Sequence, residues 1–195
     1  AVETDMEGRI VEKEEFALTL PLIIELGKNI SHTLQREKTV NFANEMVPRM
    51  RMALYQDLGI RFPGVHVRMD STTLEPDEYA ILLNEVPVVR GKIPDGYLLT
   101  NETEENLRRY NLPYMSYKNA AGLPSLWVEE RYSEIMQRAG IKFWRPSEVL
   151  VLHLSHFFRH NGGEFIGIQE VRSMLEFLEK SFPDLVKEVT RLIPL

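Results

Sequence analysis

The apolar residues of this 195-residue chain occur in short runs, and glycines and prolines separate them. Typical uninterrupted runs are Ala80–Leu83 and Val149–Leu152. A helix that crosses a bilayer needs about 20 consecutive apolar residues, so none is expected here. Short apolar runs divided by turn residues predict many small strands and helices around an internal core. We expect a mixed α/β or α+β fold.

Composition narrows the functions that such a fold can have. With 44% hydrophobic and 27% charged residues the chain is typical of a globular protein. It contains no cysteine, which excludes disulfides, thiolate zinc sites, iron–sulfur clusters and a thiol nucleophile. The net charge of −6 leaves no overall basic field for nucleic acid. No cofactor is expected.

The strand candidates are short apolar or alternating segments next to turn residues. The first, Phe16–Leu26, is apolar on nearly every residue, which predicts burial on both faces. A second run, Tyr79–Val89, contains Pro87, which predicts a break, a bulge or an edge position. The remaining candidates are Val65–Met69, Tyr97–Leu99, Leu126–Val128 and Ile141–Trp144.

Helices are predicted from start and stop signals. Pro48 favours a helix start and Gly59 its left-handed end. Residues 101–124 are rich in turn formers, and we expect loops there. The other predicted helices run over Glu129–Ala139 before Gly140, from Pro146 to near Asn161, along Ile168, Val171, Leu175 and Leu178, and onward from Pro183.

Known catalytic motifs are absent from the sequence: there is no nucleophile elbow, no phosphate-binding loop and no zinc-protease motif. Two alternatives stay open. His153, His156 and His160 share one helical face, so a metal-dependent enzyme of unfamiliar type is one of them. The other is an RNA-binding module that uses Arg49, Arg51 and Arg68. The residues alone favour a binding or structural role over an enzyme.

Seven motifs follow one another in an order that resembles one family, the type III secretion export-gate proteins. The resemblance runs from about residue 17 to the end, and the injectisome branch fits better than the flagellar one. The motifs are P-R-M-R…L-G-I at 48–60, P-G-V-H-V-R at 63–68, L-E-P-D-E-Y at 74–79, G-L-P-S-L-W-V at 122–128, S-E-V-L-V-L-H-L at 147–154, E-F-I-G-I-Q-E-V at 164–171 and P-D-L-V-K-E at 183–188.

The resemblance implies a division of the chain. Small mixed sheets covered by helices would form a discontinuous first subdomain from residues 17–96 and 146–163. An inserted small α+β subdomain would take 97–145, and a helical third subdomain would begin at 164–195 and be truncated. Residues 1–16, which are rich in acidic side chains, would be a linker.

The resemblance also implies partners. Family members are anchored in the bacterial inner membrane, and their cytoplasmic part forms a nonameric homo-oligomer ring. That part docks secretion chaperone–effector complexes and other export-apparatus proteins, without being an enzyme and without binding nucleic acid. We expect this fragment to be largely monomeric, because its third subdomain would be incomplete.

A partner-binding site is implied at the junction of the first two subdomains. In flagellar members chaperones bind a dimple there, and the motifs place Lys118, Ala121, Leu123 and Leu152 at it. Lys118 and Ala121 stand where the flagellar motif has Asp and Phe, and Leu152 replaces a Thr. We therefore expect a partner site with altered chemistry. The alternative is that Leu152 belongs to the core.

Overall fold

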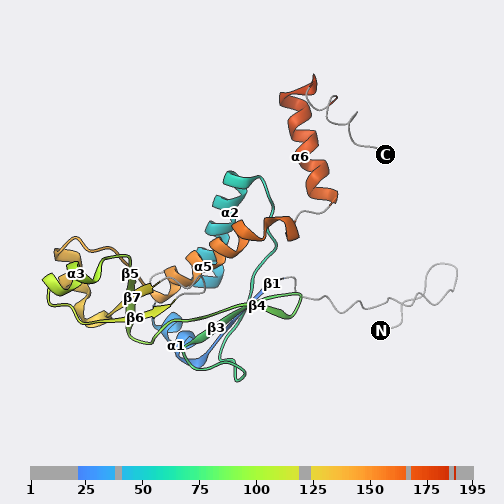
Figure 1. Cartoon of the computed structure of the whole chain (residues 1–195). Helices are drawn as coiled ribbons and strands as arrows, with labels where there is room; N and C mark the ends of the chain where they lie inside the picture. The colour runs from blue at the N-terminus through green and yellow to red at the C-terminus, as the bar shows by residue number, and fades with distance from the viewer. Residues whose placement is uncertain (1–21, 38–40, 119–123, 166–167, 185–186, 188–195) are drawn as a thin grey trace, which may run out of the picture.

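The structure is a computed structural model with two four-stranded sheets and covering helices (Figure 1). It describes residues 22–37, 41–118, 124–165, 168–184 and 187. This arrangement confirms the predicted mixed α/β fold. Residues 16–21 of the first predicted strand and most of the helix predicted after Pro183 lie outside the described residues.

The first sheet has the strand order β2-β1-β3-β4. Its central strand β1 pairs in parallel with β2 and antiparallel with β3, and β3 forms a hairpin with β4. This sheet is therefore mixed. The strands are β1 (Leu22–Leu26), β2 (His66–Arg68), β3 (Glu78–Leu83) and β4 (Val86–Lys92).

Strand β1 is buried on both of its faces, as its apolar sequence predicts. Leu22 and Ile24 point into the largest hydrophobic cluster of the described residues. Ile23 points the opposite way, where it joins Ala80 and Leu82 of β3. All of these side chains are at most 4% exposed. β1 is thus the most deeply embedded strand of the first sheet.

The β3–β4 hairpin explains the position of Pro87. Asn84 and Glu85 form its turn with positive φ angles of 48° and 67°, which suits a tight hairpin turn. β4 is an edge strand of the first sheet, and its register with β3 shifts between Ile81 and Leu82, opposite Pro87. Pro87 therefore sits at a bulge on an edge strand, which confirms the prediction.

Four helical elements accompany the first sheet. The predicted start and end of α2 are confirmed, because Pro48 lies in its first turn and Gly59 follows it in the left-handed conformation with φ 70°. A π-helical turn precedes α2 without a break. The elements are α1 (Lys28–Arg36), η1 (Phe42–Met46), α2 (Val47–Leu58) and α5 (Pro146–His160).

The second sheet has the strand order β6-β7-β5-β8, with every neighbouring pair antiparallel. Its elements follow the chain order β-α-β-β-α-β, which is a ferredoxin-like arrangement. They are β5 (Tyr97–Thr100), α3 (Glu104–Arg109), β6 (Tyr114–Lys118), β7 (Pro124–Glu129), η2 (Glu130–Tyr132), α4 (Ser133–Arg138) and β8 (Phe143–Trp144).

Two predictions about this part are wrong. Residues 101–124 were expected to form loops, but they contain α3 and β6. The helix expected over Glu129–Ala139 is shorter, because Glu129 ends β7 and a 3-10 turn precedes α4. Its predicted end is right, since Gly140 has a φ of 71°.

The two faces of the second sheet pack against different partners. One face, with Leu98 and Val128, forms a separate core with Leu107 of α3 and Met136 of α4. The other face carries a row of apolar residues in register across all four strands, and this row joins the core of the first sheet. The row consists of Met115, Trp127, Leu99 and Trp144.

Helix α5 connects the two halves, because the chain returns to the first core after completing the second sheet. α5 contacts α1 and α2 as well as β5 and β8. Figure 1 shows it running between the region of the second sheet and α2. The chain continues into η3 (Gly162–Phe165) and α6 (Ile168–Ser181), and α6 projects away from both sheets (Figure 1).

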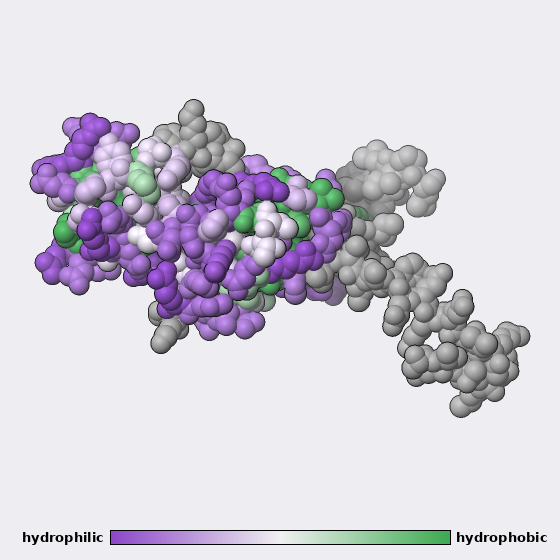
Figure 2. All heavy atoms as spheres, turned by 90° about the horizontal axis from the view of Figure 1, so that it is seen from below, coloured by the Kyte–Doolittle hydropathy of each residue, from purple (hydrophilic) through white to green (hydrophobic). Residues whose placement is uncertain are grey.

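The face of the molecule that Figure 2 shows is mostly polar. Figure 2 shows one face on which hydrophilic atoms dominate and apolar atoms form small separate patches. Among the described helices, none combines the length and the hydropathy that a bilayer crossing requires.

The packing of Tyr79 over Gly91 yields a prediction about stability. A Cβ atom on Gly91 would lie 2.5 Å from the ring carbons of Tyr79, which is 2% exposed and cannot move away. Gly91→Ala should lower the free energy of unfolding in urea by about 1–3 kcal/mol. Gly64→Ala is the matched control, because nothing lies within 4 Å of its Cβ position. Equal midpoints for the two variants would contradict this packing.

Candidate partner-binding site

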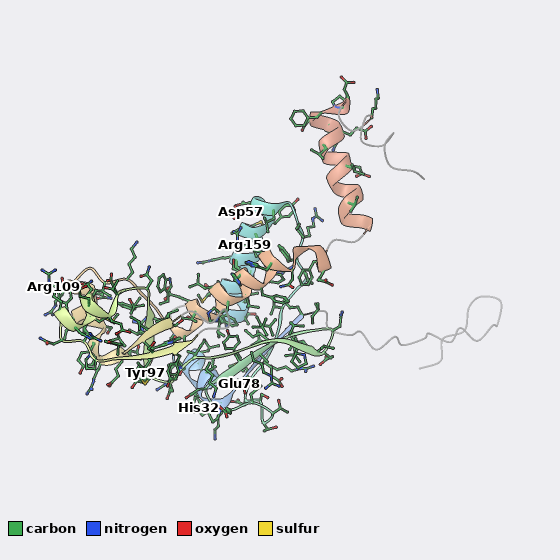
Figure 3. The ribbon with its side chains drawn as sticks, in the orientation of Figure 1. His32, Asp57, Glu78, Tyr97, Arg109 and Arg159 are labelled. Atoms are coloured by element: carbon green, nitrogen blue, oxygen red, sulfur yellow. The ribbon has the colours of Figure 1, made fainter. Side chains whose placement is uncertain are left out.

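Helix α5 is fixed by side-chain bonds at both ends. At its start Arg145 donates to Glu130 of η2 at 2.7 Å. At its end Arg159 donates to Asp57 of α2 at 2.7 Å, and these two side chains meet where the helices lie side by side (Figure 3). The carboxylate of Glu148 accepts from the backbone N–H of Arg145 and caps the first turn. The helix is thus tied to both halves of the molecule.

The two faces of α5 differ sharply. The inner face buries Val149, Leu150, Leu154, Phe157 and Phe158 in the main core. Leu152 lies on the outer face and is 44% exposed. The alternative that Leu152 belongs to the core is therefore wrong. An exposed leucine is ordinary by itself, and the partner-binding role of Leu152 stays a prediction from the family resemblance.

The other predicted site residues are only partly visible. Lys118 is the last residue of β6, and its backbone is described but its side chain is not. Ala121 and Leu123 lie outside the described residues. The structure therefore places the side chain of Leu152 and leaves the predicted grouping of all four residues as a prediction.

One exposed side chain near this site was not predicted from the sequence. Tyr117 precedes Lys118 on the edge strand β6 and is 47% exposed. Its hydroxyl lies 3.8 Å from the sulfur of Met115, two residues earlier on the same face of the strand. The alternation from Met115 to Tyr117 is a strand signal, and it could have identified both β6 and this tyrosine.

Buried Tyr79 and half-buried His153 form a polar contact between β3 and α5. The Tyr79 hydroxyl and Nδ1 of His153 are hydrogen-bonded, and their rings stack with centroids 5.6 Å apart. Burial lowers the pKa of His153, and the nearby His156 lowers it further. Burial also raises the pKa of Tyr79. The neutral forms of both side chains are therefore favoured, with the tyrosine as donor.

This contact separates the three histidines that a metal enzyme would need. His153 points toward Tyr79, whereas His156 and His160 are exposed with ring centroids 3.9 Å apart. Within the described parts of the chain, no group of three or more potential ligands gathers around a common point. The arrangement gives no support to a three-histidine centre.

The arginines of the RNA-binding alternative are also occupied. Arg51 donates to the carbonyl of Phe62 at 2.6 Å, so it serves the packing of the loop after α2. Arg68 of β2 bonds Glu85 of the hairpin turn at 2.7 Å. Arg49 has a looser contact, because its guanidinium nitrogen lies 3.7 Å from a carboxylate oxygen of Glu45. Two of the three arginines are thus held by close contacts within the chain.

A second carboxylate lies at the start of α5. Glu37 follows α1 and accepts hydrogen bonds from the side chain and backbone of Ser147. Burial nevertheless raises the pKa of Glu37, because it outweighs those bonds and the attraction of Arg145. Glu37 thus links α1 to the first turn of α5, where the helix favours negative charge.

Comparison with known proteins places the chain in a family. Residues 3–195 match the FHIPEP family, and the chain belongs to it. The low calcium response locus protein D of Yersinia pestis is 40% identical over 192 residues, which cover 97% of this chain and 26% of that protein. The predicted resemblance to the type III secretion export-gate proteins is confirmed.

Solved structures agree with this assignment. The Chlamydia pneumoniae CdsV protein matches with a TM-score of 0.81 and 61% identity, over 93% of this chain and 55% of that chain. A structure of the Chlamydia pneumoniae CdsV and CdsO complex matches with a TM-score of 0.82 and 61% identity, over 93% of this chain and 53% of that chain. Nonameric EPEC SctV-C, at 18% identity, a TM-score of 0.60 and coverage of 90% and 50%, shares the fold alone.

This chain thus spans about a quarter of the curated relative from Yersinia pestis and about half of each solved chain. Its family is that of the type III secretion export-gate proteins.

The lowered pKa of His153 leads to a prediction of how the stability of the folded chain depends on pH. Its pKa is lowered from 6.5 in the folded chain, so the unfolded chain takes up the proton more readily. Neutral His153 contributes to the free energy of unfolding. This contribution is complete above about pH 6.5, and it is lost as the pH falls toward the lower pKa of the folded chain. Urea unfolding between pH 7.5 and about 5 measures this loss.

A pair of variants isolates the effect of His153 from that of the acidic groups. His153→Gln can still bond Tyr79 but cannot titrate, so its stability should fall less steeply with acidification than that of the wild type. The exposed His66→Gln is the control and should follow the wild-type curve. Parallel curves for all three proteins would rule out this role for His153.

Proposed function

We propose that this chain is a docking domain of a type III secretion export gate, which binds chaperone–effector complexes and other export-apparatus proteins and catalyses no reaction. The observation that carries the proposal is Leu152, an apolar side chain held outward on the helix that joins the two sheets. The inner face of this helix is fully committed to the core, so the outer face is available to a partner.

The physical basis is burial of apolar surface at a fixed position. Full burial of an exposed leucine side chain contributes about 1.5–3 kcal/mol, and covering Leu152, which is 44% exposed, would contribute part of this. Because α5 is held by core packing, Leu152 loses little conformational freedom when a partner binds. Tyr117, on the edge of the second sheet, offers the aromatic kind of side chain that interfaces favour.

The residues of the β6–β7 connection complete the proposed site. Lys118, Ala121 and Leu123 belong to it by the family motif, together with Leu152. A lysine in place of the acidic residue of flagellar members favours a partner surface with negative charge. We infer that the site keeps its position in the family but recognises a different partner surface.

The proposed subdomains follow the two cores. The first would comprise residues 17–96 and 146–163, and it would contain the first sheet and α5. The second would be the ferredoxin-like unit inserted at 97–145, which has a core of its own. Residues 164–195 would begin a helical third subdomain, and 1–16 would be a linker.

Partners and location of the longer protein are part of the proposal. CdsV has been solved in complex with CdsO, which supports docking of another export component. EPEC SctV-C is described as nonameric, which supports a homo-oligomeric ring. We propose that the longer protein forms such a ring at the cytoplasmic face of the bacterial inner membrane.

Charge introduced at the proposed site should weaken docking. Leu152→Asp and Ala121→Asp should each lower the affinity for a purified chaperone–effector complex by about tenfold or more, because a buried anchor is replaced by a charge. Isothermal titration calorimetry measures the affinity, and circular dichroism checks that the fold is intact.

Ile135→Asp is the matched control, because Ile135 is 45% exposed but lies on α4, which covers the opposite face of the second sheet. This variant should bind like the wild type. If Leu152→Asp also binds like the wild type, the proposed site is wrong.

The 195-residue chain should be largely monomeric in solution, because it spans only about half of the solved relatives, among them nonameric EPEC SctV-C. Light scattering coupled to size exclusion should give a mass near 22.7 kDa. A mass of a ring of many copies would show that the first two subdomains are sufficient for assembly, contrary to the proposal.

A further inference from the structure

His156 and His160 form an exposed pair in the last turns of α5. They stand one helical turn apart, with ring centroids 3.9 Å apart and ring planes inclined by 35°. Both side chains are exposed, and neither belongs to the core. His153, on the same side of the helix, is occupied by Tyr79. The pair takes no part in the hydrogen bond between Tyr79 and His153, although His156 lies near His153 and one helical turn after Leu152.

A backbone hydrogen bond fixes one of the two rings. Nδ1 of His160 lies 2.9 Å from the carbonyl oxygen of His156, and a carbonyl can only accept, so Nδ1 carries the proton. In neutral imidazole the other nitrogen, Nε2, then has a free lone pair. Metal-binding histidines commonly have this arrangement, in which one ring nitrogen donates to a carbonyl and the other binds the ion.

The spacing of the two rings suits one ion. A bond from imidazole nitrogen to a divalent transition ion is about 2.0–2.1 Å long, so two such nitrogens lie at most about 4.2 Å apart. The two rings have centroids 3.9 Å apart, so they are close enough for rotation of the side chains to bring one nitrogen of each to a common ion. Imidazole is a preferred ligand of zinc, nickel and copper ions, and magnesium and calcium prefer oxygen.

The electrostatic setting is favourable as well. The last turn of a helix carries partial negative charge from its free carbonyl groups, which favours a cation. Arg159, the nearest basic side chain in sequence, is held by Asp57 of α2 at 2.7 Å. Its guanidinium is thereby partly neutralised and directed toward α2.

We propose that His156 and His160 form a bidentate surface site for a divalent transition ion such as Zn²⁺ or Ni²⁺, with water completing the coordination. Binding would cross-link the last turn of α5, directly before the turn η3 that leads to α6. The ion would stabilise the end of the connecting helix. This inference does not depend on the proposed docking function.

Calorimetric titration of the 195-residue chain, without an affinity tag, tests the site. ZnCl₂ added at pH 7.5 should give saturable heat for one ion per chain in the micromolar range, and MgCl₂ should give none. His156→Gln and His160→Gln should each lose saturable binding, because one imidazole cannot chelate. His32→Gln, which changes an exposed histidine on α1, should bind like the wild type.

Acidification provides a second readout. Protons compete with a metal ion for imidazole nitrogen, so the saturable heat should weaken as the pH is lowered while circular dichroism still shows helix. No saturable heat for the wild type at pH 7.5 would overturn the proposal. Binding by His156→Gln or His160→Gln equal to that of the wild type would overturn it as well.

Discussion

The row of apolar side chains across the second sheet holds the structure together. Met115, Trp127, Leu99 and Trp144 lie side by side on its four strands and pack into the core of the first sheet. A ferredoxin-like unit could bury one face on its own helices and leave the other to water. Here the second face is covered, so the two sheets and α5 share one hydrophobic core, and the position of the inserted unit is set by packing.

Charged contacts play a smaller part in this arrangement. The ion pairs at the two ends of α5 are largely exposed, and such pairs contribute roughly 0–1 kcal/mol each. The five large side chains on the inner face of α5 contribute far more, at about 1.5–3 kcal/mol for each full burial. The ion pairs join the ends of α5 to η2 and α2, but burial of the inner face holds the helix in place. The outer face, including Leu152, is presented on a support that does not need it for folding.

The prolines and glycines at the ends of helices and at the edge of the sheet could be interpreted from the sequence, because they act on the local backbone geometry. Pro48, Gly59 and Gly140 fix helix ends through backbone geometry alone, and Pro87 requires an edge or a bulge in any sheet. By contrast, α3 is only six residues long and lies among turn formers. Thr103 caps this helix and Glu104 and Glu105 lie in its first turn, but these local signals are weak beside the burial of Leu107 in the core of the second sheet, which is a tertiary contact.

The candidate site was harder to predict than the fold. Helix α5 carries apolar residues on most of its circumference, so its sequence does not tell which leucine faces outward. Leu152 could be assigned only by the family motif, and its exposure follows from the packing of both sheets on the other side of the helix. The three histidines share a helical face, yet only the Tyr79 contact distinguishes the half-buried one from the exposed pair.

Native-state hydrogen exchange tests the shared core most directly. If the apolar row unites the sheets, the slowest amides of β5, β7 and α5 should exchange with the same free energy of opening as those of β1 and β3. They should also respond to urea with the same slope, because all of them open in one cooperative event. Markedly faster exchange throughout the second sheet, with α5 and the first sheet still protected, would show two independent units and contradict this account.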